Sequence, residues 1–209
     1  MTTLHTRWQL LCKHLSLPQK TAETFNSLQS AYSEPGRFYH TLVHLEDCLI
    51  QLDTCRATAP NPHDIELALW FHDAIYDTHA ADNERQSADW ARQFLTQNGA
   101  DTKCINRVDK LIMATCHDAL PQDETECYLI DIDLSILGRT PDAFAAYEAQ
   151  VRQEYVWVPE KEFCQRRQAI LEAFLQRSQI YQTAHFYKHY EMSARRNLAN
   201  SIEHLRQAV

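Results

Sequence analysis

The sequence is poor in glycine and proline. Its 209 residues include 3 glycines and 7 prolines, too few for a sheet-rich protein that needs a tight turn about every ten residues. Gly36, Gly99 and Gly138 all fall at the edges of segments with helical periodicity, where helices start or stop. Hydrophobic residues make up 44% of the chain and charged residues 23%, as in an ordinary globular protein. The sequence therefore predicts an all-α fold.

Basic residues and long apolar runs are also scarce. There are 20 lysines and arginines against 28 acidic residues, so the formal net charge is -8. Nucleic-acid binding depends on basic side chains that neutralise phosphates, and the charge argues against that function. No apolar run approaches the ~20 residues of a membrane-spanning helix, and the first residues lack the apolar stretch of a signal peptide. We expect neither a nucleic-acid partner nor a membrane partner.

Paired cysteines are missing as well. The 7 cysteines are odd in number and include no CxxC pair, whereas a disulfide framework or a zinc ribbon needs cysteines in pairs. The pattern indicates reduced thiols and a cytoplasmic location. No feature of the sequence favours a particular oligomeric state.

Apolar residues recur at helical spacing along most of the chain. With the capping residues and glycines, this pattern predicts about ten helices, over residues 4–15, 20–32, 38–52, 61–73, 82–98, 101–117, 127–138, 140–156 and 159–178, with one or two more over 181–206. Pro18 is expected at the start of the second helix. Because the connections are short, we predict one helical domain that covers residues 1–209.

The most informative stretch is Leu67–Asp77, which reads LALWFHDAIYD. An almost wholly apolar run ends in His72 and Asp73, and Asp77 follows four residues later. Burying a charge is costly unless the charge is paired or bound to a metal. His72 and Asp73 are therefore candidate metal ligands.

Two other His-Asp pairs have different surroundings. His63-Asp64 stands at a polar helix start, where an acid is favoured by the helix dipole. His117-Asp118 ends a predicted helix. There His117 is a candidate site residue, and Asp118 is expected to be exposed.

Further ligand candidates lie upstream and downstream of this stretch. His40 and His44 are four residues apart, so on a helix they would share one face. Asp131 and Asp133 lie in an apolar segment, which should not bury two acids without a reason, and Asp131 either faces solvent or supports the site. Nitrogen and oxygen ligands on three helices suit a divalent Mn, Fe, Mg, Co, Ni or Zn ion; the set is His40, His44, His72, Asp73 and Asp133.

The order of these residues resembles the H...HD...D signature of the HD superfamily of metal-dependent phosphohydrolases. The segment 39–44, YHTLVH, resembles the YHNxxH segment of cyclic-nucleotide phosphodiesterases, and residues 133–135, DLS, resemble their DLS segment. Over nearly its full length the chain resembles a bacterial family of predicted metal-dependent HD phosphohydrolases. The resemblance implies an all-α fold in which His40 donates a proton to the leaving oxygen. The metal ligands that it implies are His44, His72, Asp73 and Asp133.

The chain departs from the phosphodiesterase pattern after the dipeptide. Tyr76 stands where HDxxHxGxxN has a histidine, so a second metal ion would lack that ligand unless His117 supplies one. With a single metal, Asp77 or Glu84 is the alternative acid or base. Asp77 would lie one turn from Asp73 if the helix continues, whereas Glu84 falls early in a helix, where the dipole alone favours an acid.

These observations predict metal-dependent hydrolysis of a phosphate ester, from a nucleotide or another small phosphorylated metabolite. The candidate substrate-binding residues are Arg37, His117 and Arg152, and Arg37 is the best placed because it lies three residues before His40. Two other functions stay open. One is a di-iron oxygenase, which needs His117 as a ligand, and the other is a non-catalytic module that uses its metal to hold a nucleotide.

Overall fold

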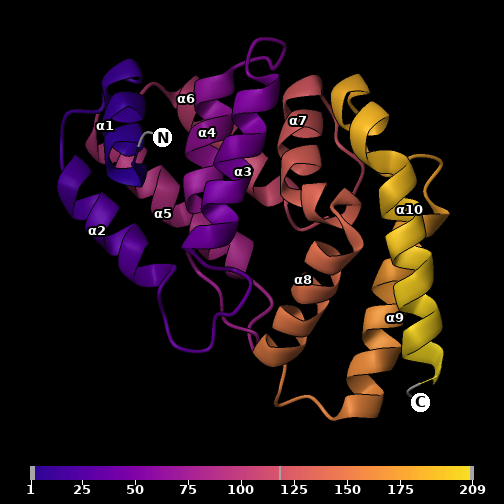
Figure 1. The fold of residues 1–209 in the computed structure, drawn as a ribbon. Helices are drawn as coiled ribbons and strands as arrows, with labels where there is room; N and C mark the ends of the chain where they lie inside the picture. Colours follow the sequence, from indigo (N-terminus) through magenta and orange to yellow (C-terminus); the bar gives the residue numbers. More distant parts are fainter. Residues whose placement is uncertain (1–2, 118, 208–209) are drawn as a thin grey trace. The chain divides into compact units, whose positions relative to one another are not determined.

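We describe the protein from a computed structural model that places residues 3–117 and 119–207. These residues form ten α-helices and one short 3-10 helix, with no strand among them, which confirms the predicted all-α class (Figure 1). The elements are α1 (Leu4–His14), α2 (Thr21–Ala31), α3 (Leu42–Cys55), α4 (Pro62–Phe71), α5 (Asn83–Gln97), α6 (Thr102–Ala114), α7 (Glu124–Asp133), η1 (Leu134–Gly138), α8 (Pro141–Glu154), α9 (Glu160–Gln176) and α10 (Ala184–Gln207). None of these helices is both long and apolar enough to cross a membrane.

Local capping chemistry explains several helix ends. The side chain of Asp101 accepts a hydrogen bond from the amide of Cys104 at the start of α6, as expected of an N-cap residue. Thr140 caps α8 in the same way. At the other end of a helix, Gly99 follows the last residues of α5 with a φ of 70°, a left-handed conformation that glycine adopts without strain. The predicted bounds of these helices are therefore confirmed to within a few residues.

The third helix begins later than predicted. Thr41 has an extended backbone, and its side chain accepts a hydrogen bond from the amide of Val43, so α3 starts at Leu42 rather than at Phe38. His40 precedes the helix, and the prediction that it shares a helical face with His44 is wrong. The prediction for Pro18 is also wrong, because α2 starts at Thr21.

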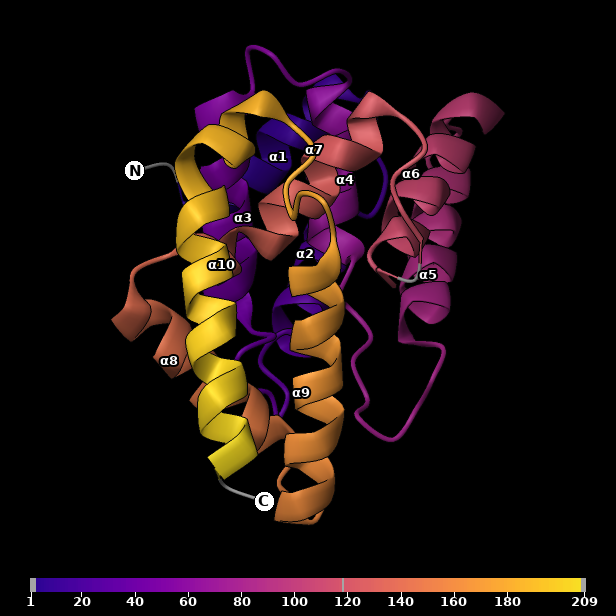
Figure 2. The same cartoon turned by 90° about the vertical axis from the view of Figure 1, so that its right-hand side faces the viewer.

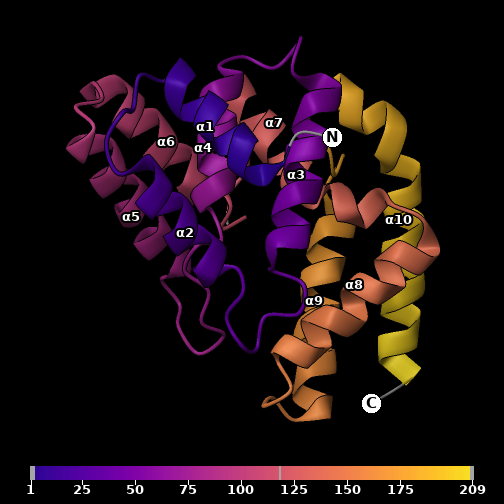
Figure 3. The same ribbon diagram turned by 60° about the vertical axis from the view of Figure 1, so that its left-hand side comes forward.

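The chain divides into two compact units, Met1–Ile130 and Asp131–Val209, and the boundary falls within α7. The single domain predicted over residues 1–209 stays a prediction, and each unit is described by itself. In the first unit, α4 packs against α1, α3, α5 and α6, while α5 and α6 lie side by side (Figures 2 and 3). Every residue from Asp64 to His72 is buried, and the two acids among them, Asp64 and Glu66, form ion pairs with arginines. The central helix therefore ends at a buried histidine.

In the second unit, α9 and α10 run antiparallel and side by side (Figures 1 and 2). α10 also packs against η1, and Gly138 permits this close approach. A Cβ atom added at Gly138 would lie 2.5 Å from the Cβ of Tyr190 and 2.8 Å from its carbonyl oxygen, closer than real atoms pack. Glycine is therefore required where these two elements meet.

Asp131 is a buried structural acid in this unit. Its carboxylate accepts hydrogen bonds from the amide of Gln182 (2.9 Å) and from the amide and hydroxyl of Thr183 (2.7 Å each), directly before α10. Burial raises the pKa of Asp131 to about 6, although the hydrogen bonds from Thr183 and Gln182 oppose the rise. The side chain is fully buried, so the alternative that Asp131 faces solvent is wrong.

Candidate metal centre

The first candidate ligand, His44, lies in the opening turn of α3. Its side chain is buried, with 4% of the residue exposed. α3 is amphipathic, and the face that carries His44 also carries Leu45, Cys48 and Leu49, all of which are buried. The same apolar pattern that packs α3 into the first unit therefore brings an imidazole into the interior.

His72 and Asp73 follow directly after the last residue of α4. The residue His72 is 2% exposed, and its Nδ1 lies 2.8 Å from the carbonyl oxygen of Leu69. Because a carbonyl only accepts hydrogen bonds, Nδ1 carries the proton in the neutral ring and Nε2 keeps its lone pair. This is the arrangement by which proteins orient a metal-binding histidine.

Three ligand atoms converge in front of this ring. The Nε2 atoms of His44 and His72 are 3.2 Å apart, and Oδ2 of Asp73 lies 3.5 Å from the first and 3.0 Å from the second. Ligand atoms about 2.0–2.2 Å from a shared ion are separated by about 3.0 Å at adjacent corners of an octahedron and by about 3.4 Å in a tetrahedron. The three atoms therefore fit a divalent metal ion as they stand.

Cys48, which the sequence analysis missed, groups with the same two histidines, and among the described residues the group with Cys48 does not include Asp73. One ligand atom each from His44, Cys48 and His72 lies within 4.8 Å of the others, and all three residues are buried. The available sequence signal was spacing, since Cys48 stands one helical turn after His44. This buried group could hold a metal ion.

The electrostatics of the cluster keep the carboxyl group of Asp73 ionised. Burial raises the pKa of Asp73, but the neighbouring imidazoles, first that of His72 and then that of His40, outweigh it and hold the pKa well below the usual range. Asp73 is therefore an ionised carboxylate, and its side chain is 18% exposed. A carboxylate in that state is a ready metal ligand.

Arg37 holds the turn that contains Asp73. Its guanidinium donates hydrogen bonds to the main-chain carbonyls of Asp73 (2.6 Å), Ala74 (3.0 Å) and His40 (3.2 Å), and it also pairs with Glu34. The side chain is 2% exposed. These contacts support a role in positioning the site, and a direct contact of Arg37 with substrate stays a prediction.

His40 lies beside the cluster, in the loop before α3. Its ring stacks on that of Tyr76 with the centroids 4.1 Å apart, and its centroid is 5.9 Å from that of the His44 ring. Tyr76 therefore supports the ring of His40 from one side. The predicted role of His40 as an acid next to the metal is compatible with this placement.

Asp77 is placed differently from the prediction. α4 ends at Phe71, so no helix continues from Asp73 to Asp77. Asp77 is exposed in a loop, where its carboxylate accepts a hydrogen bond from the amide of His79 (2.9 Å) and its main chain pairs with the side chain of Asn83. The expected alignment of Asp77 with Asp73 on one helix is wrong.

Two further candidates of the first unit lie at helix ends. Glu84 is in the first turn of α5, where the helix dipole favours an acid whether or not it is catalytic. His117 follows the end of α6 with a φ of 57°. Within the described residues, the group of ligand atoms that lie within 4.8 Å of one another does not include His117, and Asp118 is outside the described residues. The roles given to Glu84 and His117 stay predictions.

In the second unit, Asp133 is the last residue of α7 and is half-buried. Burial is the main cause of the raised pKa of Tyr147, to which the negative charges of Glu148 and Asp133 add. The effect on Tyr147 confirms neither a structural nor a metal-binding role for Asp133. Its role as a ligand therefore stays a prediction from the sequence.

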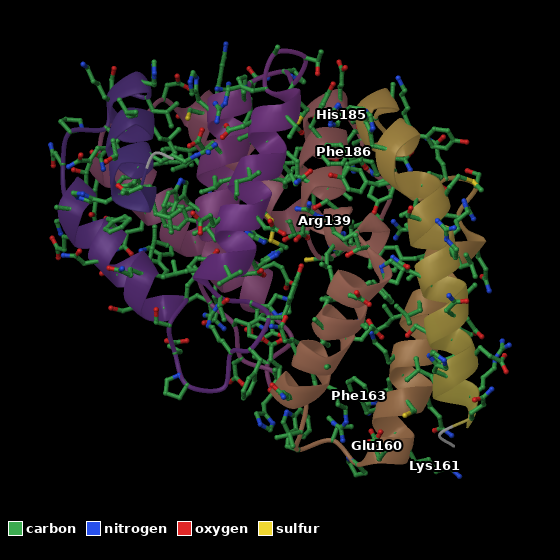
Figure 4. The ribbon with its side chains drawn as sticks, viewed as in Figure 1. Arg139, Glu160, Lys161, Phe163, His185 and Phe186 are labelled. Carbon is green, nitrogen blue, oxygen red and sulfur yellow. The ribbon has the colours of Figure 1, made fainter. Side chains whose placement is uncertain are left out.

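Arg152 joins α8 to α9. It donates hydrogen bonds to the carbonyls of Tyr155 (2.6 Å) and Val158 (3.0 Å), pairs with Glu160 (2.9 Å) and lies 4.6 Å from the centre of the Phe163 ring. Figure 4 shows Glu160 and Phe163 in the opening turns of α9. The contacts are those of a residue that fixes the α8–α9 connection, and substrate binding by Arg152 stays a prediction.

Comparison of the chain with protein-family models, with curated proteins and with solved structures found no match.

Proposed function

We propose that this protein is a metal-dependent phosphohydrolase of the HD superfamily, which cleaves a phosphate ester of a nucleotide or another small phosphorylated metabolite. The observation that carries the proposal is the convergence of Nε2 of His44, Nε2 of His72 and Oδ2 of Asp73 at 3.0–3.5 Å from one another. The order of these residues in the sequence matches the HD signature, in which Asp133 completes the ligand set.

A divalent ion held by these residues would polarise a phosphoryl oxygen and lower the pKa of a water molecule to roughly 7. In the hydrolysis, one water would lose a proton to solvent as its oxygen forms a bond to phosphorus, and the bond from phosphorus to the ester oxygen would break. The departing oxygen needs a proton, which we assign to His40. Its stacking on Tyr76 fixes the ring beside the cluster, whereas Asp77 is exposed and bonded within its own loop.

Arg37 and Leu69 position the reacting groups. Arg37 holds the carbonyls of His40 and Asp73 with one guanidinium, so the proposed acid and the proposed ligand keep a fixed separation. The carbonyl of Leu69 fixes the tautomer of His72. A site preorganised in this way avoids reorganisation during the reaction, which is a general source of catalysis.

The proposal is tested by phosphate release from a panel of phosphomonoesters and phosphodiesters. Protein stripped of metal and reloaded with Mn, Fe, Co, Ni, Zn or Mg should release phosphate with at least one metal, and His72→Ala and Asp73→Ala should abolish release. His63→Ala is the matched control, because His63 begins the neighbouring His-Asp pair and stacks on His14 instead. A reloaded wild-type protein that releases nothing from the panel would contradict the proposal.

Metal analysis separates this function from the two alternatives. A di-iron oxygenase requires two irons per chain, so one metal ion per chain excludes it. A non-catalytic module would bind nucleotide tightly without turnover. No described contact favours either alternative over hydrolysis.

A further inference from the structure

The sulfur of Cys48, a cysteine of the first unit, lies next to the imidazole ring of His44. The residue is 2% exposed, and its sulfur lies 3.7 Å from both ring nitrogens of His44, one helical turn earlier on α3. Cys55, seven residues further along the same helix, is equally buried, but its thiol contacts the main-chain carbonyls of Gln51 and Leu52 at 3.5 Å. Cys55 behaves as a core cysteine, whereas the sulfur of Cys48 faces an imidazole in the candidate metal centre.

The position of this sulfur suits coordination. A zinc ion binds thiolate at about 2.3 Å and imidazole at about 2.0–2.1 Å, so a tetrahedral site separates sulfur from nitrogen by about 3.5 Å. The observed separation of Sγ and Nε2 of His44 is 3.7 Å. The ligand atoms of Cys48, His44 and His72 also lie within 4.8 Å of one another. No large side-chain movement is needed for the three residues to share an ion.

We propose that Cys48 is a metal ligand and that its sulfur sets which metal the protein uses. The inference rests on the metal site of the proposed function and adds a ligand that the HD signature does not contain. On binding, Sγ forms a bond to the ion and the thiol proton passes to solvent. Thiolate sulfur is a soft ligand that favours Zn²⁺, and also binds Co²⁺ and iron, whereas Mg²⁺ and Mn²⁺ prefer sites made of oxygen. The structure therefore assigns a zinc-type or iron-type centre rather than a magnesium-type centre.

Cobalt spectroscopy tests this assignment without any measurement of activity. The full-length protein is stripped of metal and loaded with one equivalent of Co²⁺, and its absorption is recorded. A thiolate bound to Co²⁺ produces a charge-transfer band in the near ultraviolet, which we expect in the wild type. Cys48→Ser should lose the band. Cys55→Ser, the matched control on the same helix, should keep it.

A second readout measures metal selection. Competition between Zn²⁺ and Mn²⁺ should show at least a tenfold fall in the preference for Zn²⁺ in Cys48→Ser, since even the loss of a group that only orients a ligand costs about 10–100-fold in metal affinity, and no change in Cys55→Ser. Cys48→Ala provides a second variant if the serine hydroxyl disturbs folding. The wild-type spectrum tests the ligand even if both variants fail to fold.

The outcomes also distinguish this inference from the proposed function. If Co²⁺ binds without the band, or if the band persists in Cys48→Ser, the inference is overturned while the proposed phosphohydrolase site stands. If the band is present but no substrate of the panel is hydrolysed, Cys48 is supported as a ligand and the proposed hydrolysis fails. If no Co²⁺ binds, the inference is overturned, and phosphate release with the other metals of the panel decides the proposed function.

Discussion

The guanidinium of Arg37 lies 2.6 Å from the main-chain carbonyl oxygen of Asp73 and ties the loop before α3 to the turn after α4. The two residues are 36 positions apart in the sequence, and the same guanidinium also reaches the carbonyls of His40 and Ala74. One buried side chain therefore fixes the backbone on both sides of the candidate metal centre. Its removal should affect metal binding even though Arg37 offers no ligand atom.

Arg37→Lys should weaken both folding and metal binding. Lysine keeps the charge but loses the planar fork that reaches several carbonyls. We expect the free energy of unfolding to fall by about 2 kcal/mol, since a hydrogen bond to a charged group is worth roughly 1.5–3 kcal/mol. Metal affinity should fall about tenfold, as for other groups that orient ligands. Urea unfolding and metal titration measure the two effects. Arg166→Lys is the control, because Arg166 is 71% exposed; equal effects in both variants would contradict the positioning role.

His40→Gln should separate catalysis from metal binding. If His40 gives the proton to the leaving oxygen, its loss should lower kcat by about 10²–10⁴ and leave the metal content of the protein unchanged. His79→Gln, in the exposed loop near Asp77, should have no effect. An unchanged kcat in His40→Gln would transfer the role to Asp77 or Glu84, which Asp77→Asn and Glu84→Gln would then distinguish.

The titration of Asp131 predicts how stability depends on pH. Its folded-state pKa of about 6 lies above the usual 3.8, so the folded state holds this proton more tightly than the unfolded state. The stabilisation is fully present below the unfolded pKa and is lost as pH rises through about 6, a change of about 3 kcal/mol for two pKa units. Asp131→Asn should remove this pH-dependent part of the free energy of unfolding. Urea unfolding of metal-free protein between about pH 4 and pH 7 would measure the difference. An identical pH slope in the two proteins would contradict it.

Gly138→Ala tests the contact between η1 and α10. The added methyl group would lie under 3 Å from three atoms of Tyr190, two of them main-chain atoms, so α10 has to shift. We expect a loss of about 1–3 kcal/mol, the usual cost of overpacking. Gly99→Ala is the comparison, because its added methyl group meets nothing within 4 Å and the positive φ alone costs about 1 kcal/mol. Thermal unfolding of both variants decides the matter, and a smaller loss at Gly138 would be unexpected.

The helices were predictable because their ends depend on neighbouring residues. Asp101 caps α6 through the amide three residues later, and Gly99 ends α5 through its own backbone. The position of His40 differs from the prediction for a local reason as well. Thr41 is the N-cap of α3, so the helix begins at Leu42 and His40 precedes it. The apolar periodicity extends upstream of this cap and therefore predicts a helix start that is too early.

The composition of the site was harder to predict because it depends on contacts between distant segments. Arg37 was expected near the substrate, but its partners are main-chain carbonyls that no sequence pattern reveals. Asp131 could not be assigned, because the amides that it accepts from are about fifty residues away. Cys48 carried a usable signal in its spacing from His44. A buried cysteine is so common in an amphipathic helix, however, that the spacing was informative only once the imidazole and the sulfur were placed together.

The burial of α4 on all sides has a consequence for inherited variation. A truncation such as Leu67→Ala in this helix should destabilise the protein by about 2–5 kcal/mol, and the same helix carries His72 at its end. A metal ion present at a free concentration of a hundred times its dissociation constant would stabilise the folded protein by about 2.7 kcal/mol. Mutations in α4 should therefore produce conditional phenotypes. Cells supplied with the metal would accumulate the variant protein, and cells deprived of it would degrade the same protein.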